Sequence, residues 1–175
     1  MEVNKTNNLQ HYAMYVGTYL GIFFILKFPL VPLGIHNSFF SLLFMLLTAA
    51  VPFLMYYYAK VYRDKVCGGS IRFIQAWVFL LLSFVFASLL VAVVHYIYFR
   101  YIDNGFIINT CSAALDSFKG NPLLTKDSYN QLKEMLDQVS YLSPIKIVFQ
   151  LISQNVFYGN ILSLIVALFV MKRPK

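Results

Sequence analysis

Four long apolar blocks constrain the fold of this chain more than any other feature. The blocks cover residues of about 11–32, 38–60, 71–101 and 146–171, and charged residues stand at or near their ends. Each block is long enough to cross a hydrocarbon layer of about 30 Å as a helix. Helix is the required conformation because lipid offers no hydrogen bonds to an open backbone, and the blocks lack the alternation of barrel strands. We predict an all-α integral membrane protein with four transmembrane helices, forming one membrane domain over residues 1–175.

The composition excludes two other classes of protein. Apolar residues make up 59% of the chain and charged residues only 12%, whereas about a quarter of the residues in a soluble domain are charged. The chain is therefore neither a disordered segment nor an ordinary soluble enzyme.

The distribution of charge predicts the orientation of the spans. Residues 1–10, 60–72 and 172–175 together carry 8 basic and 2 acidic residues, whereas residues 100–146 carry 5 of each. Because loops rich in lysine and arginine stay in the cytoplasm, we predict a multi-pass protein with cytoplasmic N and C termini. The net charge of +7 then reflects topology. We expect no nucleic-acid partner, since the chain has no soluble module with a basic face and base-stacking aromatics.

Residues 102–145 are expected to form an outer, periplasmic helical hairpin between the third and fourth transmembrane helices. We expect the third span to continue outward as a helix to about residue 118, where the turn cluster 119–122 breaks it. A second helix should start near residues 125–127 with an acidic first turn. Its apolar residues recur at helical spacing. The hairpin is either a packed connector or a docking surface for a partner.

Small residues recur every four positions in two of the spans. In lipid, such stripes allow helix backbones to approach closely. We predict that the first and fourth spans use their stripes for tight contacts, with either a helix of the same chain or a second subunit as the neighbour. The third span offers Ser83 with Ala87 as a similar pair. The two stripes are Ala13, Gly17 and Gly21, and Gly159, Ser163 and Ala167.

Polar side chains inside a span mark either structural hydrogen bonds or function. Lys27 is the one charge that interrupts an apolar block, near the outer end of the first span, and it either extends to the interface or contacts an anionic substrate or headgroup. The amides of the fourth span either bond to neighbouring helices or line a wet cavity open to the outside. The intramembrane polar residues are Lys27, His95, Gln154, Asn155 and Asn160.

The chain matches none of the catalytic templates. No span contains an aspartate or glutamate for proton coupling, and the sequence has no nucleotide-binding glycine loop, nucleophile elbow or metal-ligand spacing. Cys67 and Cys111 fall on opposite sides of the predicted membrane, so we expect no disulfide between them. We predict no catalytic residues, no cofactor and no metal, and therefore no enzyme.

The loop after the second span carries a recognisable pattern. It reads Arg63-Asp64-Lys65-Val66-Cys67-Gly68-Gly69-Ser70-Ile71-Arg72-Phe73, and an aromatic-rich Ile102-Asp103 sequence ends the third span. Over essentially the whole chain, this arrangement resembles the small four-span membrane family called domain of unknown function 4199. Here Asn104 follows Asp103, where family members often have proline. We expect six loop residues to contact a partner or anionic headgroups, with plain positive-inside topology as the alternative: Arg63, Asp64, Lys65, Gly68, Gly69 and Arg72.

The resemblance implies a location but no activity. It places the protein in the inner membrane of bacteria of the Bacteroidota type, with genes for polyprenyl-phosphate glycosyltransferases as frequent neighbours. Our first hypothesis is a non-enzymatic accessory or scaffold subunit that anchors or regulates such a glycosyltransferase. The alternative is a small dimeric transporter or lipid flippase subunit, and a third hypothesis is a sensor whose outer hairpin binds a ligand. Membrane lipids, and either a membrane-protein partner or a second copy, are the expected partners.

Overall fold

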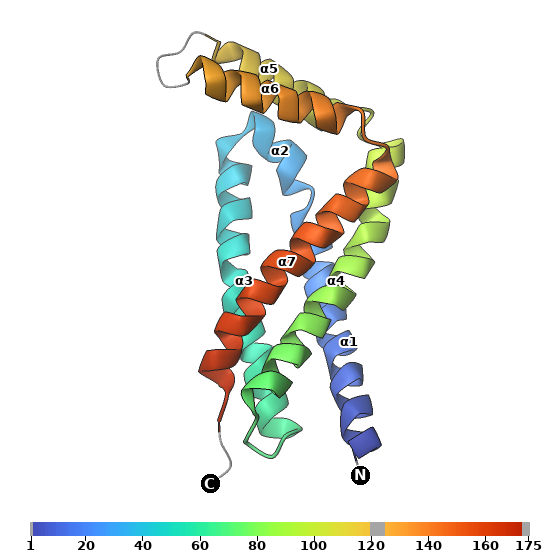
Figure 1. Cartoon of the computed structure of the whole chain (residues 1–175), viewed down its shortest axis with the longest axis vertical. Coiled ribbons are helices and arrows are strands. Elements are labelled where there is room, and N and C mark those ends of the chain that lie inside the picture. The colour runs from blue at the N-terminus through green and yellow to red at the C-terminus, as the bar shows by residue number, and fades with distance from the viewer. Residues whose placement is uncertain (1, 120–124, 173–175) are drawn as a thin grey trace. The chain divides into compact units, whose positions relative to one another are not determined.

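The chain folds into helices over nearly all of its described length. The computed structural model describes residues 2–119 and 125–172 (Figure 1). The helices that it contains are α1 (Glu2–Lys27), α2 (Leu30–His36), α3 (Ser38–Lys65), α4 (Phe73–Tyr101), α5 (Phe106–Ser117), α6 (Lys126–Ser140) and α7 (Pro144–Val170). Within these residues the sole β-type pairing is an isolated bridge between Ile71 and Lys172.

Four segments of the structure are long and apolar enough to cross a membrane. They are Asn8–Ile35, Ser38–Lys65, Phe73–Tyr101 and Pro144–Val170. This confirms the predicted all-α class with four membrane-spanning helices, and the chain is a multi-pass membrane protein. The first span is made of α1 and α2, which are separated at Phe28 and Pro29 because proline has no N–H to continue a helical ladder.

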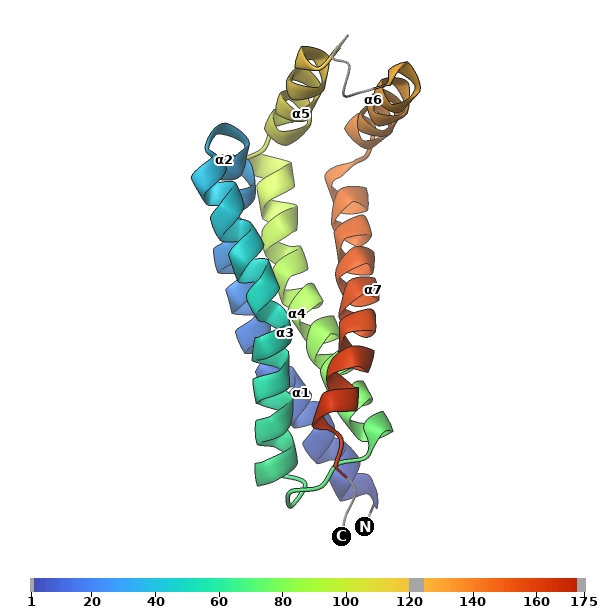
Figure 2. The ribbon, with the colours of Figure 1, turned by 90° about the vertical axis from the view of Figure 1, so that its left-hand side faces the viewer.

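Backbone contacts divide the chain into two compact units. Met1–Ala92 with Leu151–Lys175 form the first, called here the bundle unit, and Val93–Gln150 form the second, called here the hairpin unit. Figures 1 and 2 show α1, α3, α4 and α7 of the bundle unit running alongside one another. The start of α1, the end of α7 and the α3–α4 loop all lie at the same end of this unit.

The core of the bundle unit lies along α4. Ala76, Phe79, Leu80, Phe84 and Ala87 of this helix are each at most 3% exposed and belong to one buried apolar cluster. α1 and α7 both pack directly against α4 through small residues, which lets their backbones come close.

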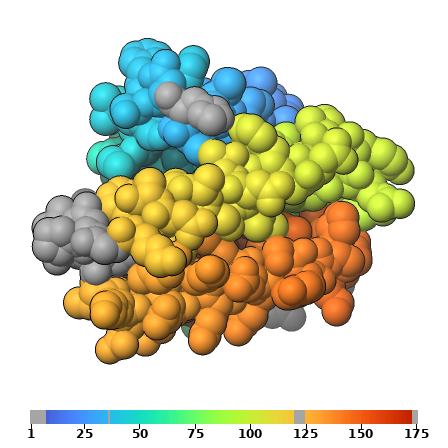
Figure 3. Space-filling view, turned by 90° about the horizontal axis from the view of Figure 1, so that it is seen from above, coloured from blue at the N-terminus to red at the C-terminus, as the bar shows by residue number. Residues whose placement is uncertain are grey.

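The hairpin unit contains α5 and α6, which contact each other (Figure 3). The Tyr129 hydroxyl of α6 donates a hydrogen bond of 2.6 Å to the Asp116 carboxylate of α5. Because this bond favours the protonated phenol, it raises the pKa of Tyr129 above its ordinary value.

α6 begins as predicted, with the Thr125 hydroxyl accepting a hydrogen bond from the Ser128 N–H. Of the predicted turn cluster 119–122, residues 120–122 lie outside the described residues.

The expectation of one continuous helix from the third span to about residue 118 is wrong. α4 ends at Tyr101, and the left-handed residues Asn104 (φ 44°) and Gly105 (φ 80°) separate it from α5. Left-handed backbone cannot continue a right-handed helix. Asp103 is a buried residue, 5% exposed, and its carboxylate accepts hydrogen bonds from the N–H groups of Gly105 (3.1 Å) and Ile107 (3.2 Å). This local carboxylate therefore satisfies two donors at the break.

Candidate functional site at the α3–α4 loop

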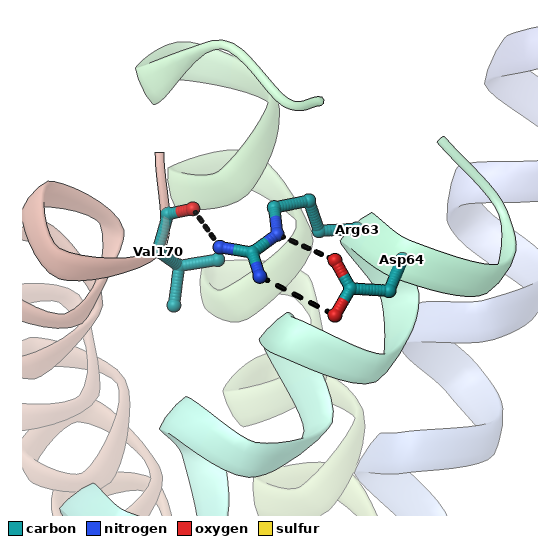
Figure 4. Close-up of polar contacts among 3 residues, drawn as sticks. All are labelled: Arg63, Asp64 and Val170. Carbon is teal, nitrogen blue, oxygen red and sulfur yellow. Dashed lines mark hydrogen bonds and ion pairs between the residues drawn. The ribbon is translucent and has the colours of Figure 1, made fainter. Parts of the chain in front are cut away.

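Arg63 joins the end of α3 to the end of α7. Its Nε and Nη2 atoms donate to the two oxygens of Asp64 at 2.8 and 3.3 Å, and its Nη1 donates to the Val170 carbonyl oxygen at 3.0 Å (Figure 4). The Arg63 side chain is 14% exposed, whereas that of Asp64 is 45% exposed. The last carbonyls of a helix lack intrahelical donors and carry partial negative charge. The guanidinium therefore supplies both a hydrogen bond and a complementary charge to the end of α7.

The loop beyond Arg63 turns sharply at two glycines. Gly68 has a φ of 65° and Gly69 a φ of 84°, and the Gly69 N–H donates to the Arg63 carbonyl at 3.0 Å. A Cβ atom on either glycine would meet nothing within 4 Å. Glycine is thus required here by backbone conformation and not by lack of space.

The same loop is tied to the chain beyond α7. The Ile71 N–H donates to the Lys172 carbonyl, and the Lys172 N–H donates to the Ile71 carbonyl, both at 3.0 Å. Ile71 is buried, at 2% exposed. Two backbone bonds and the Arg63 contact together hold the loop against the end of α7.

A cavity of about 840 Å³ lies beside this loop, within the bundle unit. Tyr62 forms part of its wall and is itself held by a stacked contact with Phe79, with ring centroids 4.2 Å apart. Residues from the start of α1, the loop and the first turns of α4 complete the lining. Its polar members include Asn8, Gln10, Ser70, Arg72 and Gln75, and its apolar members include Leu9, Ile74, Val78 and Leu82.

The structure separates the six loop residues predicted as a contact site. Arg63 and Asp64 bond to each other, and Arg63 also donates to the Val170 carbonyl of α7. Gly68 and Gly69 shape the turn. Lys65 and Arg72 are both exposed, and Arg72 lines the cavity. Sequence reasoning missed the contribution of α1 to this site, because nothing in the pattern of residues 8–10 relates them to a loop about sixty residues away.

Both small-residue stripes pack against α4. A Cβ atom on Gly17 would lie 2.6 Å from the Phe86 Cβ and 2.8 Å from the Ser83 carbonyl oxygen. A Cβ atom on Gly159 would lie 2.5 Å from the ring of Phe84. Gly21 approaches Leu90 of α4 in the same way. The remaining stripe residues, Ala13, Ser163 and Ala167, are each 0% exposed.

Lys27 is held against α3. Its Nζ atom donates to the Thr48 hydroxyl at 3.0 Å and lies 5.1 and 4.6 Å from the ring centroids of Phe24 and Phe44. Thr48 is ten residues from Ser38, the start of α3, which is about 15 Å along the helix. The ammonium group therefore lies well inside the span, where cation–π contacts stabilise it.

The other intramembrane polar residues have different surroundings. The Trp77 indole N–H of α4 donates to the Asn160 side-chain oxygen of α7 at 2.9 Å. Gln154 is exposed and Asn155 half-buried, and neither side chain makes a hydrogen bond within the described part of the chain. His95 is 8% exposed and belongs to the hairpin unit. Among residues 2–119 and 125–172, no three histidine, cysteine or acidic residues cluster in a way that could hold a metal.

These features define a polytopic helical membrane protein whose inter-helix loop is fixed to the end of its last span. The chain belongs to the family described as protein of unknown function (DUF4199), whose model matches residues 15–172. The match confirms the resemblance seen in the sequence. No curated protein and no solved structure matches the chain.

We expect Arg63→Met to lower the free energy of unfolding by about 1–3 kcal/mol, because the buried Val170 carbonyl loses its side-chain donor. Asp64→Asn should lower the stability much less than Arg63→Met, since exposed ion pairs contribute little. Thermal unfolding in detergent micelles measures both. An equal loss in the two variants would contradict a specific role for the bond to Val170.

Proposed function

We propose that this protein is a non-enzymatic accessory subunit of the bacterial inner membrane, with both termini in the cytoplasm, and that it docks onto another integral membrane protein through α7. The observation that carries the proposal is the Gln154 amide, which is exposed within an apolar span and has no hydrogen-bond partner among the described residues. The excess of basic residues in the segments 1–10, 60–72 and 172–175 supports the orientation.

Gln154 lies deep in the span. It is ten residues from Pro144 and sixteen from Val170, the two ends of α7, or about 15 and 24 Å along the axis. It also lies about 180° around the helix from Ser163, which is buried. The amide therefore points away from the bundle core, toward lipid or a partner.

An amide in hydrocarbon costs several kcal/mol unless it finds a hydrogen bond. An amide or hydroxyl on a partner helix restores such a bond and contributes about 0.6–2 kcal/mol to association. The free energy of the Gln154 amide is therefore lower in a complex with a partner helix than in the lone chain surrounded by lipid.

The surroundings of Gln154 suit a docked helix. Phe157, Tyr158 and Ile161 extend the same face and are 62%, 66% and 43% exposed. A hollow of about 510 Å³ beside them is lined by residues of α4 and α7, including Leu81, Ile152 and Phe157. Apolar side chains of a partner would fill this hollow and add van der Waals contacts.

The non-enzymatic part of the proposal is supported by chemistry. The four spans hold no acidic residue away from their ends, and the described residues include no metal-type cluster. We name as partner a glycosyltransferase that acts on a polyprenyl phosphate, a choice that rests on the family resemblance.

Replacement of Gln154 by a photo-crosslinking amino acid tests the proposal in membranes of the native host. We expect a crosslink to an integral membrane glycosyltransferase, and we expect Gln154→Leu to remove co-purification of that enzyme in mild detergent. The same variant should keep or raise the thermal stability of the lone chain, because it removes an unpaired amide from lipid.

Gln131→Leu, at an exposed position on α6, makes the same chemical change outside the spans and should leave co-purification intact. Crosslinks to lipid alone, or to a second copy of this chain, would overturn the accessory proposal. The second of these outcomes would favour a dimer.

A further inference from the structure

We propose that the cavity beside the α3–α4 loop binds the phosphate-bearing headgroup of an anionic membrane lipid, with Arg72 as its cationic contact. This inference is independent of the docking of α7, because the two sites have no described residue in common. It assigns a ligand class to a site that the family membership leaves without one.

The lining of the cavity changes from polar to apolar along α4. Arg72 and Gln75 stand at the start of the helix, and an apolar stripe of Ile74, Val78 and Leu82, spaced four residues apart, runs along it. This apolar stripe covers about 12 Å along the axis. A lipid has the same order of groups, a charged head followed by hydrocarbon. A soluble anion has no hydrocarbon part that could contact the stripe.

Among the described residues that line the cavity, Arg72 is the cation available to a ligand. Arg63 is occupied by Asp64 and the Val170 carbonyl, and Lys65 does not line the cavity. The Arg72 guanidinium is exposed and has no hydrogen bond or ion pair within the described residues. Because guanidinium binds phosphate oxygens in a bidentate manner, this side chain suits a phosphate ester better than it suits a neutral ligand.

The electrostatics of the lining favour an anion over a cation. Among the described residues no aspartate or glutamate lines the cavity, and its other polar members include the amides of Asn8, Gln10 and Gln75. The first turn of α4 contains no acidic residue, and the N-terminal end of a helix carries partial positive charge. The side-chain NH2 groups and the end of the helix would each offer hydrogen bonds or positive potential to a phosphate group.

The position of the cavity, near one end of the spans, suits the headgroup of a lipid. Its lining residues come from the first turns of α1, the basic loop and the start of α4, at the end of the bundle unit where α7 also ends. Basic residues at this level attract anionic lipids by about 1 kcal/mol each. Its volume of about 840 Å³ falls in the range of about 300–1,000 Å³ typical of ligand pockets.

Native mass spectrometry of the full chain in detergent, titrated with phosphatidylglycerol, tests the inference. We expect a saturable one-to-one complex and a loss of affinity of about tenfold in Arg72→Gln, as charge-assisted hydrogen bonds are removed. Lys65→Gln removes the same charge from an exposed position outside the cavity and should change the affinity less than about twofold. Equal losses in the two variants would show diffuse attraction and overturn the proposal.

A second variant tests the apolar part of the site without removing charge. Ile74 is 65% exposed, so Ile74→Trp adds bulk to the cavity lining without disturbing the core. We expect it to weaken binding of phosphatidylglycerol at least about fivefold while thermal unfolding in lipid-free detergent stays unchanged. Unchanged lipid binding in this variant would place the lipid elsewhere.

Two further ligands separate a lipid from other sources of phosphate. Phosphatidylcholine, which is zwitterionic, should bind at least about tenfold more weakly than phosphatidylglycerol. Inorganic phosphate at the same concentration should not displace the lipid, since it cannot occupy the apolar stripe. Equal binding of phosphatidylcholine, or displacement by inorganic phosphate, would overturn the assignment to an anionic lipid.

Discussion

Replacing Gly17 by leucine is expected to detach α1 from α4. A Cβ atom at this position already comes within 2.6 Å of the Phe86 Cβ and 2.8 Å of the Ser83 carbonyl oxygen. Both are fixed by the backbone of α4, so a change of rotamer cannot relieve the overlap. We expect a loss of about 3 kcal/mol or more in the free energy of unfolding, measured by thermal unfolding in detergent micelles.

Ala49→Leu provides the matched control. Ala49 is exposed on α3, so the added bulk enters detergent or lipid, and alanine and leucine have similar helix propensities. We expect this variant to unfold at the temperature of the original protein. If Gly17→Leu were as stable as Ala49→Leu, the close packing of α1 on α4 would be disproved.

Asn104→Pro is expected to dismantle the connection between α4 and α5. Asn104 has a φ of 44°, whereas the ring of proline fixes φ near −65°. The backbone must therefore abandon the left-handed turn, and the Asp103 carboxylate then loses the N–H donors of Gly105 and Ile107. We expect a local loss of about 3 kcal/mol or more, seen as faster hydrogen–deuterium exchange in residues 105–110.

Asn104→Gly is the control for this experiment. Glycine adopts positive φ without steric cost, so exchange in residues 105–110 should stay within about twofold of the original protein. Since the family resemblance places proline here in many members, the proline variant also asks whether those chains leave α4 by a different turn. Unchanged protection in Asn104→Pro would show that the left-handed turn does not hold the start of α5.

The four spans could be predicted because the length and hydropathy of each segment are enough to identify it. A run of apolar residues between charged ones specifies a helix through length and hydropathy alone, as in Phe73–Tyr101. The stripes containing Gly17 and Gly159 could be identified for the same reason, since residues four apart share one face of a helix. The stripes could not reveal that both pack against α4. The residues on one face of a helix show that a neighbour can approach closely, but they do not specify which helix that neighbour is.

The break after α4 was missed although its signal was present. Asp103-Asn104-Gly105 is a turn sequence, but apolar residues at helical spacing on both sides of it favoured one long helix. Here the local conformational preference of three residues prevailed over the periodicity of the longer segment. The start of α6 at Thr125 was predictable, because a capping side chain acts within its own turn.

The sequence by itself determined that this protein resides in a membrane, how many spans it has and how its charges are distributed along the chain. These properties depend only on composition and on the order of neighbouring residues. Only the tertiary structure decided how individual polar groups are used. It bonded Arg63 to the Val170 carbonyl, 107 residues away, and held Lys27 beside Thr48. It left the side chains of Arg72 and Gln154 without hydrogen bonds in the described chain. The physical reason is that hydrogen bonds form between groups that the packed helices bring within about 3 Å, and such distances between remote segments exist only after the chain has folded.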